Sequence, residues 1–239
     1  MEATEGTLLG GRVRYAQPAR GFRSGIEPVL LAAAVPARPG EHVLEGGSGA
    51  GAASLCLAAR VPGVFGVGIE QDPGLVALAD RNAGANGVAV RFVVGDVLAS
   101  PVAGPFDHVF ANPPYHALTG TGSPDQARIA AKRGAPGLLG EWAAVLGVTL
   151  RHGGTLSLVL PPARLEEALA GCARGACGST RLLPLWPRAG RPAKLLLLRA
   201  VRGGRAPTAL LAGIVLHGPD GKFTPEIEAC LRDGAALAF

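Results

Sequence analysis

The chain has 239 residues, of which 48% are hydrophobic and 17% charged, and this balance excludes an intrinsically disordered protein. The length suffices for a buried core without disulfides or a structural metal. The four cysteines include no CxxC pair and have no histidine at zinc-ligand spacing, which predicts buried or half-buried thiols and no metal site. A net charge of +5 permits an anionic partner without requiring one, while the lack of a long apolar stretch and the acidic start predict a cytoplasmic protein without a membrane partner.

The first 40 residues are rich in glycine, arginine and proline and contain one apolar helix, 27–35. Short apolar strands then alternate with helices: strands 42–45, 64–70, 90–94 and 106–111, and helices 52–60 and 73–85. Pro73 favours a helix that begins there, because proline is preferred in the first helical turn.

After a polar loop the pattern continues with a helix at 138–151, a strand at 155–160 and a helix at 165–173. Segments 181–185 and 194–201 flank the short turn PRAGRPA, so we expect them to form an antiparallel strand pair. A short strand at 212–216 precedes a C-terminal helix that Thr224 would cap, with Pro225 in its first turn.

Strands that alternate with helices predict an α/β fold with a seven-stranded, mostly parallel sheet, an antiparallel terminal strand pair and helices on both faces. We interpret residues 1–239 as one domain, made of an N-terminal segment, 1–40, and a core, 41–239. In open sheets of this kind ligands bind beyond the carboxyl ends of the strands. The residues that end the strands are therefore the candidates for chemistry.

A glycine-rich loop, GGSGAG at 46–51, follows the first core strand and lets the backbone turn tightly and approach a ligand closely. Carboxylates end this strand and the next two. The candidate cofactor-binding residues are Glu45, Gly47, Gly49, Gly51, Glu70 and Asp96. Glu45 can hold an ammonium group, Glu70 can accept both hydroxyls of a ribose, and Asp96 can accept from an adenine amino group. Three acids around one loop suit a nucleoside that carries positive charge and would repel a pyrophosphate.

The loop by itself leaves alternatives open. Gly47-x-Gly49-x-x-Ala52 also satisfies the looser fingerprint of a nicotinamide site, with Glu70 at about the right distance, and a structural glycine-rich turn is a further alternative. Glu45 favours S-adenosylmethionine, because dinucleotide folds usually have an apolar residue directly before the loop.

The tetrapeptide Asn112-Pro113-Pro114-Tyr115 follows the fourth strand, so it is expected at the same edge as the glycine loop. The Asn112 side-chain carbonyl and the Pro113 backbone carbonyl can accept both N–H bonds of a planar amino group and direct its lone pair at a methyl donor. The prolines stiffen the turn, and Tyr115 can stack on a base and exclude water. Such a transfer requires no titrating base, so His116 is interpreted as an ordinary loop residue. Alone, the tetrapeptide is also compatible with a simple turn.

In this order, the loop, the acids and the Asn-Pro-Pro-Tyr motif resemble class I S-adenosylmethionine-dependent methyltransferases of the small-domain, amino-methylating type. More narrowly, the chain is similar to the bacterial tRNA1(Val) adenine-N6 methyltransferase family, also at 25–31, 125–128, 191–194 and 217–220. Glu27 and Glu45 stand where that family more usually has aspartate, and Gly46 and Ser48 also differ. The resemblance implies a Rossmann-like fold, S-adenosylmethionine as methyl donor with S-adenosylhomocysteine as product, and adenine N6 of a tRNA as acceptor.

Basic residues near the motif are the candidates for substrate binding: Arg128, Lys132, Arg191 and Lys194. Arg133, Arg181, Arg188 and Arg199 belong to the same two groups. With the predicted topology both groups could flank the catalytic edge and grip phosphates; the alternative is a scatter of solvated arginines. Aromatic residues are only 5% of the chain, which favours a folded RNA held by its backbone over a broad stacking platform.

The leading hypothesis is a tRNA adenine-N6 methyltransferase. One rival is a protein glutamine-amide N5-methyltransferase that acts on a release factor, because relatives with the same loop have that activity. A second rival is a nucleic-acid-binding protein that keeps the fold without turnover. The intact Asn112, Tyr115, Glu70 and Asp96 argue against this second rival. The oligomeric state is left open.

Overall fold

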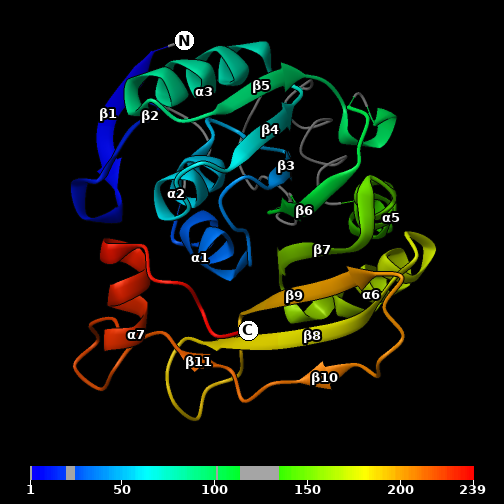
Figure 1. Ribbon diagram of the computed structural model, residues 1–239. Coiled ribbons are helices and arrows are strands. Elements are labelled where there is room, and N and C mark those ends of the chain that lie inside the picture. The colour runs from blue at the N-terminus through cyan, green and yellow to red at the C-terminus, as the bar shows by residue number, and fades with distance from the viewer. Residues whose placement is uncertain (1, 20–24, 101, 114–134) are drawn as a thin grey trace.

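The computed structural model describes residues 2–19, 25–100, 102–113 and 135–239. Its centre is a mixed sheet with seven main strands in the spatial order β5-β4-β3-β6-β7-β9-β8 (Figure 1). The strands are β3 (His42–Gly46), β4 (Phe65–Glu70), β5 (Val90–Val94), β6 (Phe106–Ala111), β7 (Leu150–Leu160), β8 (Cys177–Trp186) and β9 (Leu195–Arg202). Strands β3 to β7 are parallel, and β9 runs antiparallel to both β7 and β8. This confirms the predicted sheet and its antiparallel terminal pair.

Two two-residue strands, β10 (Ala209–Leu210) and β11 (Ile214–Val215), extend the sheet by pairing in parallel with β8. The order of the parallel strands reverses between β3 and β6, since β4 and β5 continue on one side of β3 and β7 lies on the other. Such a reversal opens a crevice at the carboxyl edge, which is where open α/β sheets bind ligands.

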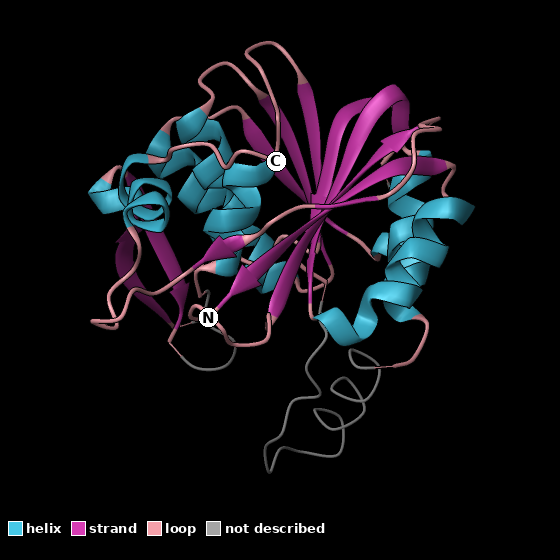
Figure 2. Cartoon of the chain, turned by 90° about the horizontal axis from the view of Figure 1, so that it is seen from below, coloured by secondary structure: helices cyan, strands magenta, loops and turns pink. Residues whose placement is uncertain are grey.

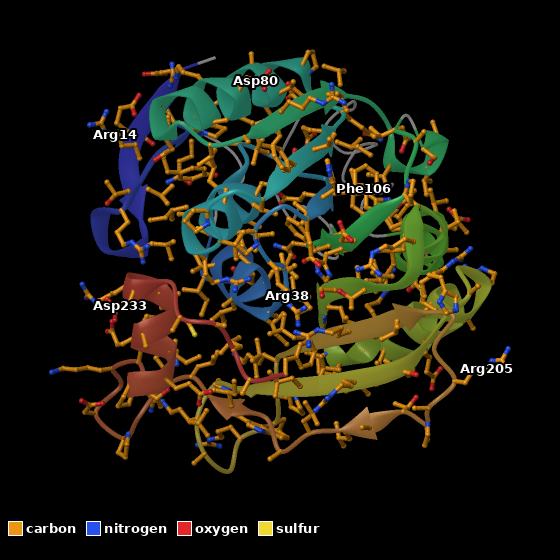
Figure 3. The ribbon with its side chains drawn as sticks, viewed as in Figure 1. Arg14, Arg38, Asp80, Phe106, Arg205 and Asp233 are labelled. Carbon is orange, nitrogen blue, oxygen red and sulfur yellow. The ribbon has the colours of Figure 1, made fainter. Side chains whose placement is uncertain are left out.

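Helices cover both faces of the sheet, as predicted, and Figure 2 shows the two helical layers with the sheet edge-on between them. One layer contains α1 (Glu27–Ala34), α2 (Ala52–Arg60) and α3 (Pro73–Asn86), and the other contains α5 (Leu138–Val148) and α6 (Leu165–Arg174). Each layer packs on its own apolar cluster, so the sheet separates two cores. Asp80 of α3 also accepts a hydrogen bond from the backbone N–H of Phe92 (3.1 Å) on the edge strand β5 (Figure 3).

The start of α3 agrees with the prediction from Pro73. The Asp72 side chain accepts hydrogen bonds from the backbone N–H groups of Gly74 (2.7 Å) and Leu75 (3.3 Å), which satisfies two donors that no helical carbonyl can reach. Gly87 ends the helix in the left-handed conformation, with φ +61°.

Two local predictions were wrong. The helix predicted at 138–151 ends at Val148, and β7 begins at Leu150 because the chain turns at Thr149 and re-enters the sheet through an irregular stretch. Thr224 precedes α7 (Pro225–Glu228) but does not cap it, because its hydroxyl donates to the carbonyl of Val215 instead (2.9 Å). The last helical turns continue as a π-helix, Ala229–Asp233.

An N-terminal hairpin was not predicted. Strands β1 (Ala3–Leu8) and β2 (Val13–Pro18) pair antiparallel around a short turn, and β2 lies along α3 (Figure 1). Strand β2 is docked by amide side chains of the helix. Asn82 accepts from the Ala16 N–H and donates to the Ala16 carbonyl (both 2.9 Å), and Asn86 makes the same pair of bonds with Arg14 (2.9 and 2.7 Å). The two asparagines, one helical turn apart, thus bond the backbone N–H and C=O groups of β2 that a neighbouring strand would otherwise pair with.

All four cysteines are buried free thiols, as predicted, and burial raises the pKa of Cys56 to about 12. Within the described ranges, no helix combines the length and apolar character needed to cross a membrane. Among the same residues, no group of three or more histidine, cysteine, aspartate or glutamate side chains is placed to hold a metal ion.

Candidate active site

Strand register brings the predicted site residues together. Gly46, at the end of β3, lies opposite Ile69 of β4 and Ala111 of β6. The next residues along these three strands are Gly47, Glu70 and Asn112, and neighbouring strands are about 4.8 Å apart. The glycine loop, Glu70 and Asn112 therefore share one crevice at the point where the strand order reverses.

The glycine loop needs glycine for two different reasons. Gly47, Gly49 and Gly51 all have positive φ, at 67°, 55° and 88°. A Cβ atom at Gly47 would lie 2.6 Å from the Trp142 ring, and one at Gly51 would lie 2.7 Å from the Phe92 ring. A Cβ at Gly49 would meet no atom of the described residues within 4 Å, so no described side chain packs against this side of the loop. The loop is therefore packed against aromatic rings at Gly47 and Gly51 and is not covered by described side chains on this side at Gly49.

Glu70 is held against this open part of the loop. Its Oε2 accepts a hydrogen bond from the Gly49 N–H (2.9 Å) and its Oε1 accepts one from the Asp72 N–H (3.0 Å). Each carboxylate oxygen can accept a further bond. Asp96 lies at the end of the adjacent strand β5, where it is exposed and caps a short 3₁₀ turn by accepting from the Leu98 N–H (2.9 Å). The two acids thus line the crevice on the β4–β5 side.

Glu45 is buried, unlike Glu70 and Asp96. Its side chain is 4% exposed, and its Oε2 accepts bonds from both the backbone N–H (3.0 Å) and the hydroxyl (2.5 Å) of Ser54 in α2. Burial raises the pKa of this carboxyl to about 8, and the nearby Glu70 carboxylate acts in the same direction. Both of these hydrogen bonds are made to Oε2.

Asn112 keeps an unused acceptor. Its Oδ1 is buried and has no hydrogen-bond partner in the described part of the chain, and Pro113 beside it is buried. An unpaired buried amide oxygen costs about 1–3 kcal/mol, so a position that keeps one is a candidate for binding a donor. Ser48 of the glycine loop has a second buried oxygen without a partner. Pro114 and Tyr115, with His116, Arg128, Lys132 and Arg133, lie outside the described residues.

These residues fit a positively charged nucleoside. The crevice combines the carboxylates of Glu70 and Asp96, the buried carboxyl group of Glu45 and two unpaired acceptor oxygens, all of which attract cations or hydrogen-bond donors. A pyrophosphate would face the same carboxylates and be repelled. The geometry therefore suits S-adenosylmethionine better than a dinucleotide.

The predicted basic group on β8 and β9 divides into two. Arg191 and Lys194 lie in the turn between these strands, and the pairing of Leu160 with Leu196 places that turn at the same edge as Asn112. Arg199 lies further down β9 and is half-buried. It donates to the carbonyls of Ala34 and Phe239 and stacks over the Phe239 ring at 4.3 Å, and burial lowers its pKa to about 10.

Arg199 therefore holds the C-terminal residues against α1 and does not flank the crevice. Arg181 pairs with Arg199 across the two strands, at the same depth. The expectation that the whole basic group lines the catalytic edge was wrong for these two residues.

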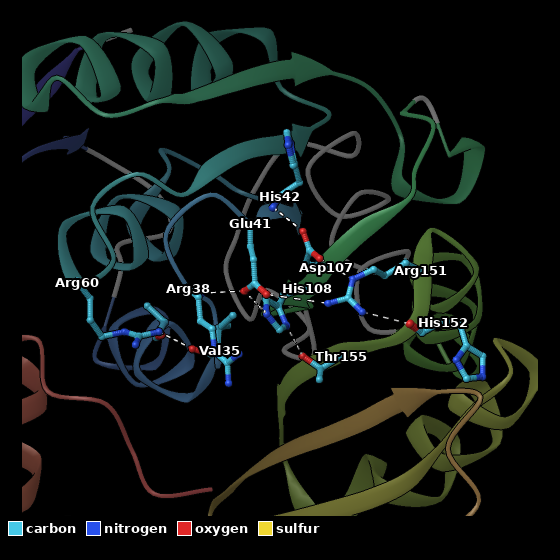
Figure 4. Close-up of polar contacts among 11 residues, drawn as sticks. Val35, Arg38, Glu41, His42, Arg60, Asp107, His108, Arg151, His152 and Thr155 are labelled. Atoms are coloured by element: carbon cyan, nitrogen blue, oxygen red, sulfur yellow. Dashed lines mark hydrogen bonds and ion pairs between the residues drawn. The ribbon is translucent and has the colours of Figure 1, made fainter.

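A second polar cluster lies at the opposite, amino edge of the sheet (Figure 4). The His108 imidazole lies 2.9 Å from Glu41 Oε2 and 2.8 Å from Thr155 Oγ1, and Arg151 pairs with Asp107 (2.5 Å). Burial lowers the pKa of His108. Because a carboxylate accepts, Nε2 carries the proton and Nδ1 accepts from the Thr155 hydroxyl. This cluster joins β3, β6 and β7 and lies at the wrong edge to act on a ligand in the crevice.

Sequence reasoning missed one residue that bears on the site. Asn82 is 2% exposed, and besides docking β2 its Nδ2 donates to the carbonyl of Ala50 in the glycine loop (3.0 Å). The available signal was Asn82 inside the predicted helix 73–85, where this residue type is unfavourable, with a second asparagine, Asn86, one turn further along. Asn86 docks the hairpin without touching the loop, so it is a matched control.

We expect Asn82→Ala to weaken S-adenosylhomocysteine binding about three- to tenfold, because the loop carbonyl loses its donor. Asn86→Ala should leave the affinity unchanged while lowering the melting temperature. Isothermal titration calorimetry and thermal unfolding on both variants measure this difference. Equal affinities in the two variants would reduce Asn82 to a purely structural role.

Comparison with known proteins agrees with this geometry. A model of the methyltransferase small domain family matches residues 27–138. The tRNA1(Val) (adenine(37)-N6)-methyltransferase of Aeromonas hydrophila is 30% identical over 205 residues, which cover 85% of this chain and 86% of that protein. The release factor glutamine methyltransferase of Rhodospirillum rubrum is 49% identical, but only over 78 residues, which are 32% of this chain and 24% of that protein.

Among solved structures, a predicted O-methyltransferase from Agrobacterium tumefaciens superposes with a TM-score of 0.74 at 25% identity. The match covers 89% of this chain and 98% of that one.

Proposed function

The chain belongs to the family of the bacterial tRNA1(Val) adenine-N6 methyltransferases and is an S-adenosylmethionine-dependent methyltransferase, and on this premise we propose that it methylates the N6 amino group of an adenine in tRNA. The observation that carries the proposal is the unpaired, buried Oδ1 of Asn112 beside the open glycine loop. The family resemblance points to the adenine next to the anticodon.

In the proposed reaction, Asn112 and Pro113 orient the acceptor. Bound S-adenosylmethionine supplies an electrophilic methyl group on a sulfonium. The Asn112 Oδ1 and the Pro113 carbonyl accept the two N–H bonds of the adenine amino group, which turns its lone pair out of conjugation. The nitrogen forms its bond to carbon while the carbon–sulfur bond breaks and leaves its electron pair on sulfur. The nitrogen then loses one proton to water, and S-adenosylhomocysteine is the product.

The proposed cofactor contacts follow from the crevice. Glu70 accepts the ribose hydroxyls, Asp96 accepts from the adenine amino group of the cofactor, and Glu45 holds its ammonium group through Oε1. Gly47, Gly49 and Gly51 let the backbone approach the ligand. Pro114 and Tyr115 complete the acceptor loop in this proposal.

The acceptor is proposed to be RNA because basic side chains lie at the carboxyl edge of the sheet, the edge that also carries Asn112. Arg191 and Lys194 are exposed there, and Arg128 and Lys132 follow the Asn-Pro-Pro-Tyr motif in sequence. A release factor glutamine is the second candidate, because its planar amide would use the same two acceptor carbonyls. The release factor glutamine methyltransferase of Rhodospirillum rubrum also matches about a third of this chain.

Mass spectrometry decides between these acceptors. The purified protein is incubated with labelled S-adenosylmethionine and either total tRNA or a release factor. We expect labelled N6-methyladenosine from the tRNA digest and none in the factor. Label in a glutamine would favour the second candidate. Binding of S-adenosylhomocysteine without label in either acceptor would favour a nucleic-acid-binding protein without turnover.

A further inference from the structure

A hollow of about 600 Å³ lies outside the cofactor crevice, between the β8–β9 turn and the loop after β11. Its lining residues are Pro187, Arg188, Arg191, Pro192, Ala193, Lys194, His217 and Gly221. We call it the rim hollow. The methyl-transfer step does not use the residues of the rim hollow, so they have a separate role.

The rim hollow lies on the catalytic edge. Leu160 at the end of β7 pairs with Leu196 near the start of β9, and Val215 of β11 pairs with Trp186 at the end of β8. Both walls thus continue from strand ends at the edge where Asn112 follows β6. Since β9 and β8 are two and three strands from β6, the turn lies about 10–14 Å along the edge from Asn112.

The charges in the rim hollow are unpaired. Arg188, Arg191 and Lys194 are exposed, and none of them takes part in an ion pair among the residues that the structure describes. Arg188 reaches across to the opposite wall, where a Cβ atom at Gly221 would lie 3.7 Å from its Nη2. Asp220 in that wall turns its Oδ1 to the Lys222 N–H (3.0 Å). Three cations therefore converge on a concave surface.

The second wall is fixed in place. The His217 Nδ1 lies 3.1 Å from the carbonyl of Pro187, so the two walls are joined directly. The His217 ring stacks on Phe223 at 4.7 Å, and the backbone bridge between these two residues closes the loop. A preformed concave site lined by exposed cationic side chains is a usual arrangement for binding a phosphate group.

We propose that the rim hollow binds a backbone phosphate of the RNA acceptor and so orients the strand whose adenine enters the crevice. This inference rests on the proposed function, because it specifies how the same acceptor is held. A phosphodiester matches the site in charge and geometry, whereas a release factor would bring a neutral glutamine amide and no phosphate. The rim hollow thus selects for a nucleic acid acceptor.

The test compares two triple variants with the same change in charge. The rim variant is Arg188→Ala, Arg191→Ala and Lys194→Ala. The control is Arg38→Ala, Arg174→Ala and Arg205→Ala, which removes three exposed arginines at the amino edge; Figure 3 shows Arg205 projecting from the loop after β9. Binding of total tRNA and of S-adenosylhomocysteine is measured at 50, 100 and 200 mM salt, together with the melting temperature.

We expect the rim variant to bind tRNA at least about tenfold more weakly at 100 mM salt, with the magnitude of the slope of log affinity against log salt reduced by about one, the change that follows from losing one phosphate contact. Its affinity for S-adenosylhomocysteine and its melting temperature should match the wild type, and the control should keep most of its tRNA affinity. Equal losses in both variants, or no loss in the rim variant, would overturn the inference. These measurements record binding and not turnover. Their outcome is therefore independent of the methylation assay, which tests the proposed function.

Discussion

Asn112→Ala is expected to lower kcat for methyl transfer about 100- to 1,000-fold, the effect of removing one preorganised polar group from a reacting centre. Asn112 Oδ1 is the unpaired buried acceptor at the end of β6, and without it the amino group keeps its lone pair in conjugation. The affinity for S-adenosylhomocysteine should stay within about twofold, because the glycine loop and Glu70 remain intact. Single-turnover kinetics with labelled methyl donor, together with calorimetry, measure both quantities.

Two further substitutions separate the effect of the hydrogen-bond acceptor of Asn112 from the effect of its side-chain volume. Asn112→Leu keeps a similar volume but has no acceptor, so it should be as inactive as the alanine variant. Asn112→Asp keeps an acceptor oxygen in nearly the same place and should retain more activity than either. Full turnover in Asn112→Leu would remove the proposed role of this residue.

Cofactor affinity is expected to rise with pH up to about pH 8 through Glu45. Burial raises the pKa of this carboxyl to about 8, so at neutral pH the cofactor-free protein holds it protonated. An ammonium group requires the carboxylate, so binding releases a proton, and the affinity for S-adenosylhomocysteine should rise by up to about tenfold per pH unit below the pKa. Above pH 8 the affinity should level off. Calorimetry in two buffers of different ionisation enthalpy counts the released proton.

Glu45→Gln is the control for this pH dependence, because its amide fills the same space and does not titrate. Its affinity should be independent of pH between 6 and 8 and close to that of the protonated wild type. The same group affects stability with a known sign. Its folded pKa lies above the unfolded value, so its contribution to the free energy of unfolding is complete below about pH 4.5 and is lost as pH rises towards 8.

His108 acts in the opposite direction, because burial lowers its pKa and its protonation destabilises the fold as pH falls below about 6.5. Comparing wild type with Glu45→Gln at each pH cancels this contribution. An identical pH dependence of cofactor binding in the two proteins would show that Glu45 does not face the ammonium group.

The sequence by itself determined the parallel part of the fold and the position of the crevice. Strand–helix alternation from 42 to 111 implies parallel strands, and parallel strands bring their carboxyl ends to one edge. Glu70 ends one strand and Asn112 directly follows another, so their proximity to the glycine loop follows from chain order alone. Local pattern was sufficient because each of these positions depends on the periodicity of the segment that precedes it.

Only the tertiary structure decided which side chains stay available to a ligand. Arg191 and Arg199 both belong to the terminal hairpin, yet they have different roles. Arg191 lies in the turn and borders the rim hollow, whereas Arg199 lies eight residues further along, within β9, and holds the C-terminal residues. Sequence position placed Glu45 directly before the glycine loop, but only the tertiary structure shows that it is buried and hydrogen-bonded to Ser54 in the next helix. The hairpin at 3–18 gave no local signal, since Asn82 and Asn86 complete its pairing from a helix more than sixty residues away. Contacts between distant segments set burial, and burial sets which polar groups are free to bind.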